Sequence, residues 1–342
     1  MIIENVAGPS PFTSDPSRHS IVEPTIMPPP LRNTHLLPDK QTANVLVQSY
    51  FTNTNGLVEI FDRNQFMATL ETCYADPLTV DPSWLCLLHL TFALGLVMAA
   101  PLPGSDEEVI IQKLKAGGVD RAHVFYLNAR SLSDPLSTGF EDSGFWSIQA
   151  LALMTIYMLA ISKRNTAYAY YGMAVRSAFS LGLHKEETML IFSPADQAIR
   201  KNLWRTLFVL DRFLSASLGR PTAIHEDDCS GDTLARDLKL PGPELERDVD
   251  PGIETTNSRG LQASVRTCHI VGVILQEVYS KRKVSTKIAQ QIAEQCKGWG
   301  QTLDPMLRSR PSSSTMTPSQ GIAVLHTNLF YYHSVILLTR PF

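Results

Sequence analysis

Apolar positions recur at helical spacing along most of the chain. From Pro38 onward, periodic apolar segments alternate with short breaks, and no segment shows clear period-two alternation. Recurrence every three or four residues is typical of helices that bury one face. The pattern therefore predicts an all-α fold, a single large multi-helix domain with no β-sheet core. Helices are predicted near 39–52, 63–74, 82–100, 106–131, 143–162, 166–181, 194–218, 261–282, 285–303 and 319–339.

The helix predicted at 194–218 has clear signals at both ends. Ser193 is a good N-cap, Pro194 suits the first turn, and Asp196 stands where a capping box has its acid. Gly219 is a typical stop. Between these ends the helix is apolar around nearly its whole circumference, which indicates a mostly buried helix.

Asp211 is the unusual residue of this helix, because it falls inside the apolar region. An unpaired buried carboxylate costs several kcal/mol, so a partner is expected. Arg220 lies just beyond Gly219, where the chain reverses. We therefore predict a buried Asp211–Arg220 ion pair, and we interpret it as structural rather than as part of a ligand site.

A second stop is predicted at the end of the helix at 166–181. Gly182 provides a left-handed residue, and Leu183 is placed to fold back as the apolar contact of such a cap. His184 then lies near the helix end, where the helix dipole favours a positive charge. A capping histidine is preferred over a catalytic one, because neither a nucleophile nor a metal partner accompanies it.

Two charge-free runs, 84–100 and 145–162, are 17 and 18 residues long. That length is the lower limit for crossing a bilayer whose core is about 30 Å thick. Polar residues interrupt both runs, which favours buried helices over membrane spans.

Composition and cysteine spacing restrict the classes of function and the cellular compartment that fit this chain. The net charge of −3 provides no overall basic field for nucleic acid. Five irregularly spaced cysteines, without a CxxC pair, argue against a disulfide framework and a zinc site and favour a reducing compartment. The first residues lack the basic and apolar regions of a signal peptide, which indicates an intracellular protein.

Known catalytic and cofactor motifs are absent from the sequence, so we predict no enzyme, no catalytic residue, and no cofactor or metal site in this chain. The one dense polar cluster runs from His225 to Asp232 and includes Glu226, Asp227 and Asp228. Its spacing matches no calcium loop, so a solvated loop is preferred over a metal site. The Pro-rich residues 1–31 are predicted to be a disordered tail, and loops are predicted near 241–260 and 308–320.

Four stretches together resemble a known family. They are LPDKQTANVLVQSYFTNTNGLVEIFDRNQF (37–66), AYYGMAVRSAFSLGLHKE (169–186), RKNLWRTLFVLDRFLSASLGRPTAIHEDDC (200–229) and HTNLFYYHSVILLTRPF (326–342). This order of elements resembles the fungal-specific transcription factor domain, or middle homology region, of the zinc-cluster transcription regulators, over residues 32–342. The family signature is carried here by Gly182, His184, Trp204, Asp211, Arg212, Gly219, Arg220 and Pro221.

The resemblance implies a regulatory domain that controls transcription in a fungal nucleus, through an effector response or through protein contacts. DNA binding and zinc would belong to a six-cysteine module outside this chain, and homo- or heterodimers with related regulators and a small-molecule effector are the implied partners, with no membrane. We interpret the chain as a fragment or a shortened paralogue. Two alternatives remain open: a protein-interaction scaffold and a helical small-molecule-binding protein.

Overall fold

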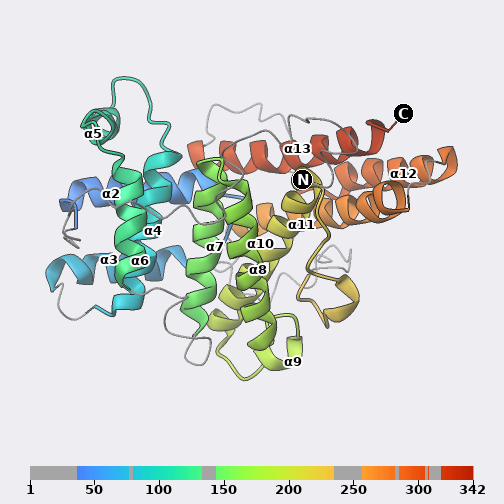
Figure 1. The fold of residues 1–342 in the computed structure, drawn as a ribbon, viewed down its shortest axis with the longest axis horizontal. Coiled ribbons are helices and arrows are strands. Elements are labelled where there is room, and N and C mark those ends of the chain that lie inside the picture. Colours follow the sequence, from blue (N-terminus) through green and yellow to red (C-terminus); the bar gives the residue numbers. More distant parts are fainter. Residues whose placement is uncertain are drawn as a thin grey trace, which may run out of the picture.

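The computed structural model describes residues 37–76, 80–132, 144–234, 256–281, 285–304, 307 and 317–341. In this part of the chain 76% of the residues are helical and there is no strand, so the predicted all-α fold is confirmed. Figure 1 shows the arrangement of the helices. They are α2 (Lys40–Thr54), α3 (Arg63–Ala75), α4 (Pro82–Val97), α5 (Asp106–Lys115), α6 (Arg121–Leu132), α7 (Phe145–Ala160), α8 (Arg164–Ser180), α9 (Glu186–Met189), α10 (Pro194–Leu218), η3 (Glu226–Asp228), α11 (Thr256–Ile274), η5 (Leu275–Ser280), α12 (Thr286–Thr302) and α13 (Pro318–Thr339).

Helix α4 lies at the centre of the N-terminal half. It packs against α2, α6 and α7, and every residue from Cys86 to Leu96 is buried. Helix α7 is likewise buried from Ser147 to Met158, and it packs against α4 and α8. A helix enclosed by neighbours on all sides has no solvent face on which to place charges. The prediction that the two charge-free runs are buried helices is therefore confirmed for α4 and α7.

The C-terminal helices form a second apolar cluster beside the first. Helix α11 packs against both α10 and α13, and α12 joins them. The rings of Trp299 and Tyr331 stack with centroids 4.6 Å apart, which ties α12 to α13. Helix α13 also returns to α2, where His326 Nδ1 lies 2.9 Å from the carbonyl oxygen of Asn55. The first and the last of the described helices, α2 and α13, are thus in contact.

The helix predicted at 106–131 is wrong as a single element, because the chain breaks it into α5 and α6. Gly118 has a positive φ of 65°, which ends the continuous helical path. Asp120 then caps the next helix, since its carboxylate accepts a hydrogen bond from the backbone nitrogen of His123 at 3.0 Å.

Smaller differences concern the short elements and the loops. The 3-10 turn η3 and the four-residue α9 were not predicted, and the end of the predicted helix 261–282 is a π-helix, η5. Helices α11 and α13 begin at Thr256 and Pro318, so both extend into the ranges predicted as loops. Apart from Thr317, which caps α13, the rest of those loops and the predicted tail at 1–31 lie outside the described residues.

Helices α2 and α4 approach each other most closely at Gly95. A Cβ atom at this position would lie 2.1 Å from the carbonyl oxygen of Leu46, and Ser49 Oγ donates a hydrogen bond to the carbonyl oxygen of Gly95 at 2.7 Å. Only a residue without a side chain permits this backbone contact.

We expect Gly95→Ala to lower the free energy of unfolding by about 2 kcal/mol or more, because the added methyl group forces α2 and α4 apart. Gly172→Ala is the matched control, since no atom lies within 4 Å of the Cβ position in α8. Alanine is the better helix former, so this control should be neutral or stabilising by up to about 1 kcal/mol. Urea unfolding measures both, and equal values for the two variants would contradict the close contact.

Candidate functional site

The end of α8 adopts the predicted left-handed stop. Gly182 has a φ of 69°. Its backbone nitrogen donates to the carbonyl oxygen of Phe179, and the backbone nitrogen of Leu183 donates to the carbonyl oxygen of Ala178. Leu183 is buried beneath this turn, as a Schellman cap requires. The chain is thereby turned toward α9 and α10.

His184 and Trp204 connect this turn to α10. The Phe179 ring lies 4.8 Å from the His184 ring and 5.3 Å from the Trp204 ring, and Trp204 is fully buried. Burial and the neighbouring Lys185 lower the pKa of His184. The ring is half-buried against aromatic side chains, which opposes the positive charge that the helix end was expected to favour.

Both predicted ends of α10 are confirmed. Ser193 Oγ accepts a hydrogen bond from the backbone nitrogen of Asp196 at 3.2 Å and donates one to its carboxylate at 2.7 Å. At the other end Gly219 has a φ of 64°. The left-handed residue reverses the chain, so that residues 221–224 run back along the last turns of α10.

Asp211 is buried, at 1% exposure, and its carboxylate is surrounded by donors. Its oxygens accept hydrogen bonds from the Arg212 guanidinium and from the backbone nitrogens of Ala223 and Ile224, the last two at 2.9 and 3.3 Å. Burial, followed by the negative charge of Asp211, raises the pKa of the nearby Tyr171. The carboxylate thus holds the returning chain against the helix from which it came.

The predicted Asp211–Arg220 pair is wrong. Arg220 Nη2 donates to the side-chain oxygen of Asn165 at 2.7 Å, and its guanidinium lies 4.4 Å from the centre of the Tyr168 ring. The left-handed turn at Gly219 directs Arg220 toward the start of α8, away from Asp211. The partner of Asp211 is Arg212, the next residue in the helix, because its long side chain curls back toward the same returning segment.

Arg212 extends the network beyond Asp211. Its Nη1 also donates to the carbonyl oxygen of Ile224 at 3.1 Å, and its Nη2 donates to Glu226 Oε1 at 3.3 Å. The guanidinium lies 4.3 Å from the centre of the Phe208 ring. Arg212 is 4% exposed, so these interactions replace its contact with water.

Glu226 carries the network to α11. Its Oε2 lies 2.8 Å from Nδ1 of His269, whose Nε2 lies 3.1 Å from the carbonyl oxygen of Leu234. A carboxylate and a carbonyl can only accept, so both bonds form together when the imidazole carries two protons. Burial raises the pKa of Glu226, but the hydrogen bond from His269 and the charges of His269 and Arg212 outweigh it and hold the pKa below its ordinary value.

The predicted solvated loop is therefore correct only in part. Asp227 and Asp228 are exposed, whereas Glu226 is half-buried and joins α10 to α11. No group of three or more histidine, cysteine or acidic side chains in the described residues has the arrangement of a metal site. The loop has a packing role on one side and faces solvent on the other.

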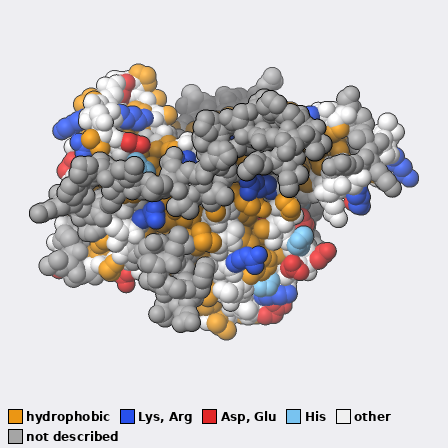
Figure 2. Space-filling model, in the orientation of Figure 1, with side chains coloured by type: hydrophobic (Ala, Val, Ile, Leu, Met, Phe, Trp, Pro, Cys, Tyr) orange, Lys and Arg blue, Asp and Glu red, His pale blue; other side chains and the backbone are white. Residues whose placement is uncertain are grey.

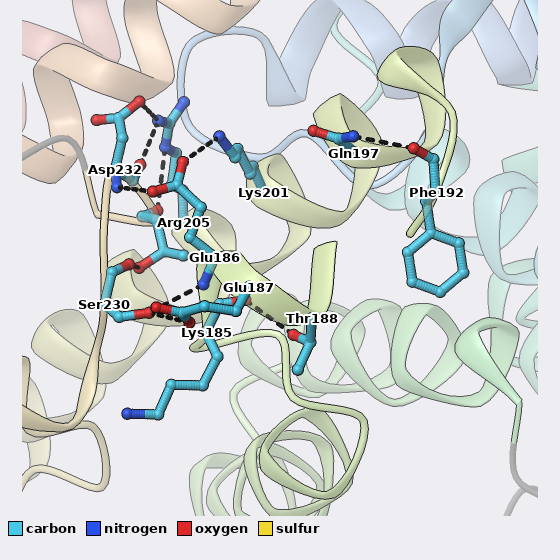
Figure 3. Close-up of polar contacts among 11 residues, drawn as sticks. Lys185, Glu186, Glu187, Thr188, Phe192, Gln197, Lys201, Arg205, Ser230 and Asp232 are labelled. Carbon is cyan, nitrogen blue, oxygen red and sulfur yellow. Dashed lines mark hydrogen bonds and ion pairs between the residues drawn. The ribbon is translucent and has the colours of Figure 1, made fainter. Parts of the chain in front are cut away.

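A second polar cluster holds the far end of the same loop, as Figure 3 shows. The nearly buried Arg205 donates to the carbonyl oxygens of Asp232 and Thr233. Glu186 of α9 pairs with Lys201 at 3.1 Å and accepts a hydrogen bond from the backbone nitrogen of Asp232 at 3.3 Å. The segment that follows α10 is thus fixed by charged side chains along its length.

We call this arrangement the α10 latch: the side chains Asp211, Arg212, Glu226, His269 and Arg205, together with the segment 221–234 that they hold. Of the signature residues, Trp204, Asp211 and Arg212 are buried parts of α10, and Gly219 and Gly182 shape turns. Pro221 lies in the latched segment, where its carbonyl oxygen is 3.4 Å from Ser215 Oγ. His184 packs against Trp204, and Arg220 lies outside the latch.

Sequence reasoning missed Glu226, His269 and Arg205 as members of one network. Glu226 stood in a run of acids that is typical of a solvated turn, and His269 lies in an apolar helix far along the chain. No local pattern connects them, because the contact depends on how α10 and α11 pack.

Comparisons with known proteins agree with this picture. The profile of a family described as "Fungal specific transcription factor domain" matches residues 47–319. The chain therefore belongs to the fungal-specific transcription factor domain family, and the resemblance inferred from the four motifs is confirmed. No solved structure matches it.

Several fungal regulators are similar over most of this chain. "Acetamidase regulatory protein" of Aspergillus fumigatus is 29% identical and covers 89% of the chain, "Activator of stress genes 1" of Saccharomyces cerevisiae is 26% identical over 90%, and "Filamentous growth regulator 27" of Candida albicans is 26% identical over 90%. The matched regions are 36%, 32% and 37% of these relatives. The chain thus spans about a third of the length of the regulators that it matches.

We expect a double-mutant cycle to separate the true partner of Asp211 from the predicted one. Asp211→Ala and Arg212→Ala should each lower the free energy of unfolding by about 3 kcal/mol, because removing either leaves a buried charge without its partner. Their combination should cost about 2 kcal/mol less than the sum, since the second change removes the stranded charge.

The matched cycle uses Arg220→Ala, which should add to Asp211→Ala within about 0.5 kcal/mol because the two residues are not in contact. Urea unfolding curves provide all the values. Coupling of Asp211 to Arg220 instead of Arg212 would contradict the geometry of the latch.

Proposed function

We propose that this chain is the regulatory domain of a fungal zinc-cluster-type transcription factor and acts in the nucleus through protein contacts. Membership of the family, together with relatives that are named as transcriptional regulators, carries this proposal. DNA binding is assigned to a zinc-cluster module elsewhere in the polypeptide, so that any zinc would be bound there. The chain is proposed to have no enzymatic role.

The charge distribution supports an indirect role in DNA binding. On the face drawn in Figure 2, basic and acidic side chains are interspersed with hydrophobic ones, and no basic stripe extends across the described atoms. Non-specific affinity for DNA comes mainly from clustered lysine and arginine that neutralise phosphates. With a net charge of −3, this chain is better suited to protein contacts.

The α10 latch is the proposed regulatory element. It connects α10 and α11 through a segment that carries exposed acids on its outer side, so that a partner bound to the outer side would act on the helical core. Coupling of this kind requires an element with two arrangements that both sites influence. Glu226 contacts both Arg212 of α10 and His269 of α11, and we propose that the coupling passes through this residue.

The alternative of a small-molecule-binding protein has one candidate location. A groove of about 630 Å³ lies between the end of α11 with η5 and helix α12, and it is lined by Val273, Glu277, Ile288, Gln291, Ile292, Glu294 and Gln295. Its volume lies in the range of ligand sites, but such sites usually enclose most of their ligand. Because Gln291, Glu294 and Gln295 are exposed, the groove is open, and protein contacts are the favoured function.

A reporter assay tests the proposed role. The chain is fused to a heterologous DNA-binding domain in a fungal host, and a reporter with the matching sites is measured against the DNA-binding domain alone. We expect the fusion to change expression at least threefold. Glu226→Gln should reduce that effect at least twofold, because an amide is a weaker acceptor for Arg212 and His269 than a carboxylate.

The matched control is Asp228→Asn, which makes the same chemical change on an exposed residue of the same turn. This control should behave as the unchanged fusion does, at equal protein levels by immunoblot. A fusion that leaves the reporter unchanged would contradict the regulatory role, and equal effects of the two variants would remove the latch from it.

A further inference from the structure

A serine, Ser285, stands between η5 and α12 in a strongly basic stretch of the sequence. The stretch 281–287 reads KRKVSTK, with Arg282 and Lys283 three and two positions before Ser285. It carries four basic side chains and no acid. Residues 282–284 lie outside the described residues and enter here by their sequence alone, whereas Ser285 itself is described.

Basic residues at these two positions are the pattern that one class of protein kinases selects. The substrate channel of such basophilic kinases carries carboxylates, which pair with an arginine three residues before the acceptor hydroxyl and with a second base two residues before it. A guanidinium and a carboxylate form a two-pronged, charge-assisted hydrogen bond. The sequence before Ser285 therefore has the required charges, and what remains is an accessible hydroxyl.

The described backbone presents Ser285 in a form that suits an acceptor. Its φ and ψ are −121° and 130°, so the residue is extended, and α12 begins at the next residue, Thr286. The side chain is partly exposed and makes no capping hydrogen bond to α12. A kinase binds the acceptor hydroxyl beside a catalytic aspartate that accepts its proton. An extended residue can reach that aspartate without the unwinding of a helix.

Thr166 is a useful comparison, because it has a similar sequence in a different backbone. Lys163 and Arg164 precede it by three and two positions. However, Thr166 lies in the first turn of α8, where the backbone is already helical. The charge pattern alone favours both hydroxyls, and the fold favours Ser285.

We propose that Ser285 is a phosphorylation site for a basophilic protein kinase, which uses Mg²⁺-bound ATP. The serine oxygen forms a bond to the γ-phosphorus of ATP, the bond from that phosphorus to the β,γ-bridging oxygen breaks, and the serine proton passes to the aspartate of the kinase. The products are phosphoserine and ADP. This inference goes beyond the proposed function, because the step requires only the folded chain, ATP and the kinase.

The phosphate at Ser285 lies at the beginning of α12, the helix that Figure 1 shows at the end of the molecule opposite α3 and α5. This helix has no acid in its first turn, and Lys287 is exposed there. Phosphoserine carries a charge of about −1.5 to −2 at pH 7, which the helix dipole favours at this end. Its oxygens can accept hydrogen bonds from the first-turn amides. Because α12 packs against α11 and α13, phosphorylation acts on the C-terminal cluster of helices.

Phosphorylation of the purified chain tests the proposal. The chain is incubated with Mg²⁺-ATP and the catalytic subunit of the cyclic-AMP-dependent kinase, which is basophilic, and tandem mass spectrometry locates the phosphate. We expect the phosphate at Ser285. Ser285→Ala should lower the incorporated phosphate at least tenfold, because the acceptor oxygen is lost. Thr286→Ala, the matched control on the neighbouring hydroxyl, should stay within twofold of wild type.

A second pair of variants tests whether the kinase reads the basic pattern. Arg282→Gln should lower kcat/KM for the chain as substrate at least tenfold, because an amide cannot form the charged pair with the carboxylates of the kinase. Lys287→Gln is the matched control on the other side of Ser285 and should stay within threefold. Circular dichroism of both variants should match that of wild type.

Hydrogen exchange measures the effect on α12. In the phosphorylated chain the amides of Lys287 and Ile288 should exchange at least threefold more slowly, because the phosphate accepts hydrogen bonds from the first turn. The amides of α5, which does not contact α12, are the internal control and should be unchanged.

A folded chain that incorporates no phosphate, or that incorporates it at Thr166 instead of Ser285, would overturn the proposal. Equal kcat/KM for Arg282→Gln and wild type would show that the basic pattern is not read. Unchanged exchange at Lys287 and Ile288 would contradict the effect on α12. None of these outcomes depends on the reporter response of the latch variants, so the two proposals can fail separately.

Discussion

The carboxylate of Asp211 is the group on which the described architecture most depends. A negative charge at 1% exposure is stable only if donors surround it, and the polypeptide provides them from Arg212 and from the backbone of Ala223 and Ile224. Two of these donors lie in the segment after α10, so the buried charge determines the path of that segment. Because Gly219 allows the reversal, the returning chain reaches the carboxylate without strain.

Other charged side chains extend the network from Asp211 to neighbouring helices. The Arg212 guanidinium contacts Asp211 through Nη1 and Glu226 through Nη2, and Glu226 in turn contacts His269 of α11. At the other end of the segment, Arg205 and Glu186 bind the backbone near Asp232. In this chain two of the main helices, α10 and α11, are thus joined through charged side chains as well as through apolar packing. Replacing such networks by apolar residues is often neutral for stability, which suits a role in specifying one arrangement.

How far the sequence predicted the structure depends on whether the signals were local. The ends of α10 were predicted correctly because Ser193, Pro194 and Gly219 act on the backbone within one turn. The single helix expected at 106–131 was wrong. Apolar positions recur at helical spacing on both sides of Gly118, and the prediction gave this pattern more weight than the stop at Gly118 and the cap at Asp120. Asp211 was recognised as a buried charge from its position in the apolar face. Its partner was misassigned, because the direction of Arg220 depends on the turn at Gly219 and on Asn165 of α8.

Hydrogen exchange at the backbone of Ala223 and Ile224 tests the central claim most directly. Ala223 is exposed, so an amide there would exchange rapidly unless the buried carboxylate of Asp211 holds it. We predict that both amides exchange as slowly as those of the buried part of α10, with protection that is lost in Asp211→Ala. Rapid exchange of these two amides in the wild-type chain, at the rate of the exposed Asp227, would contradict the latch.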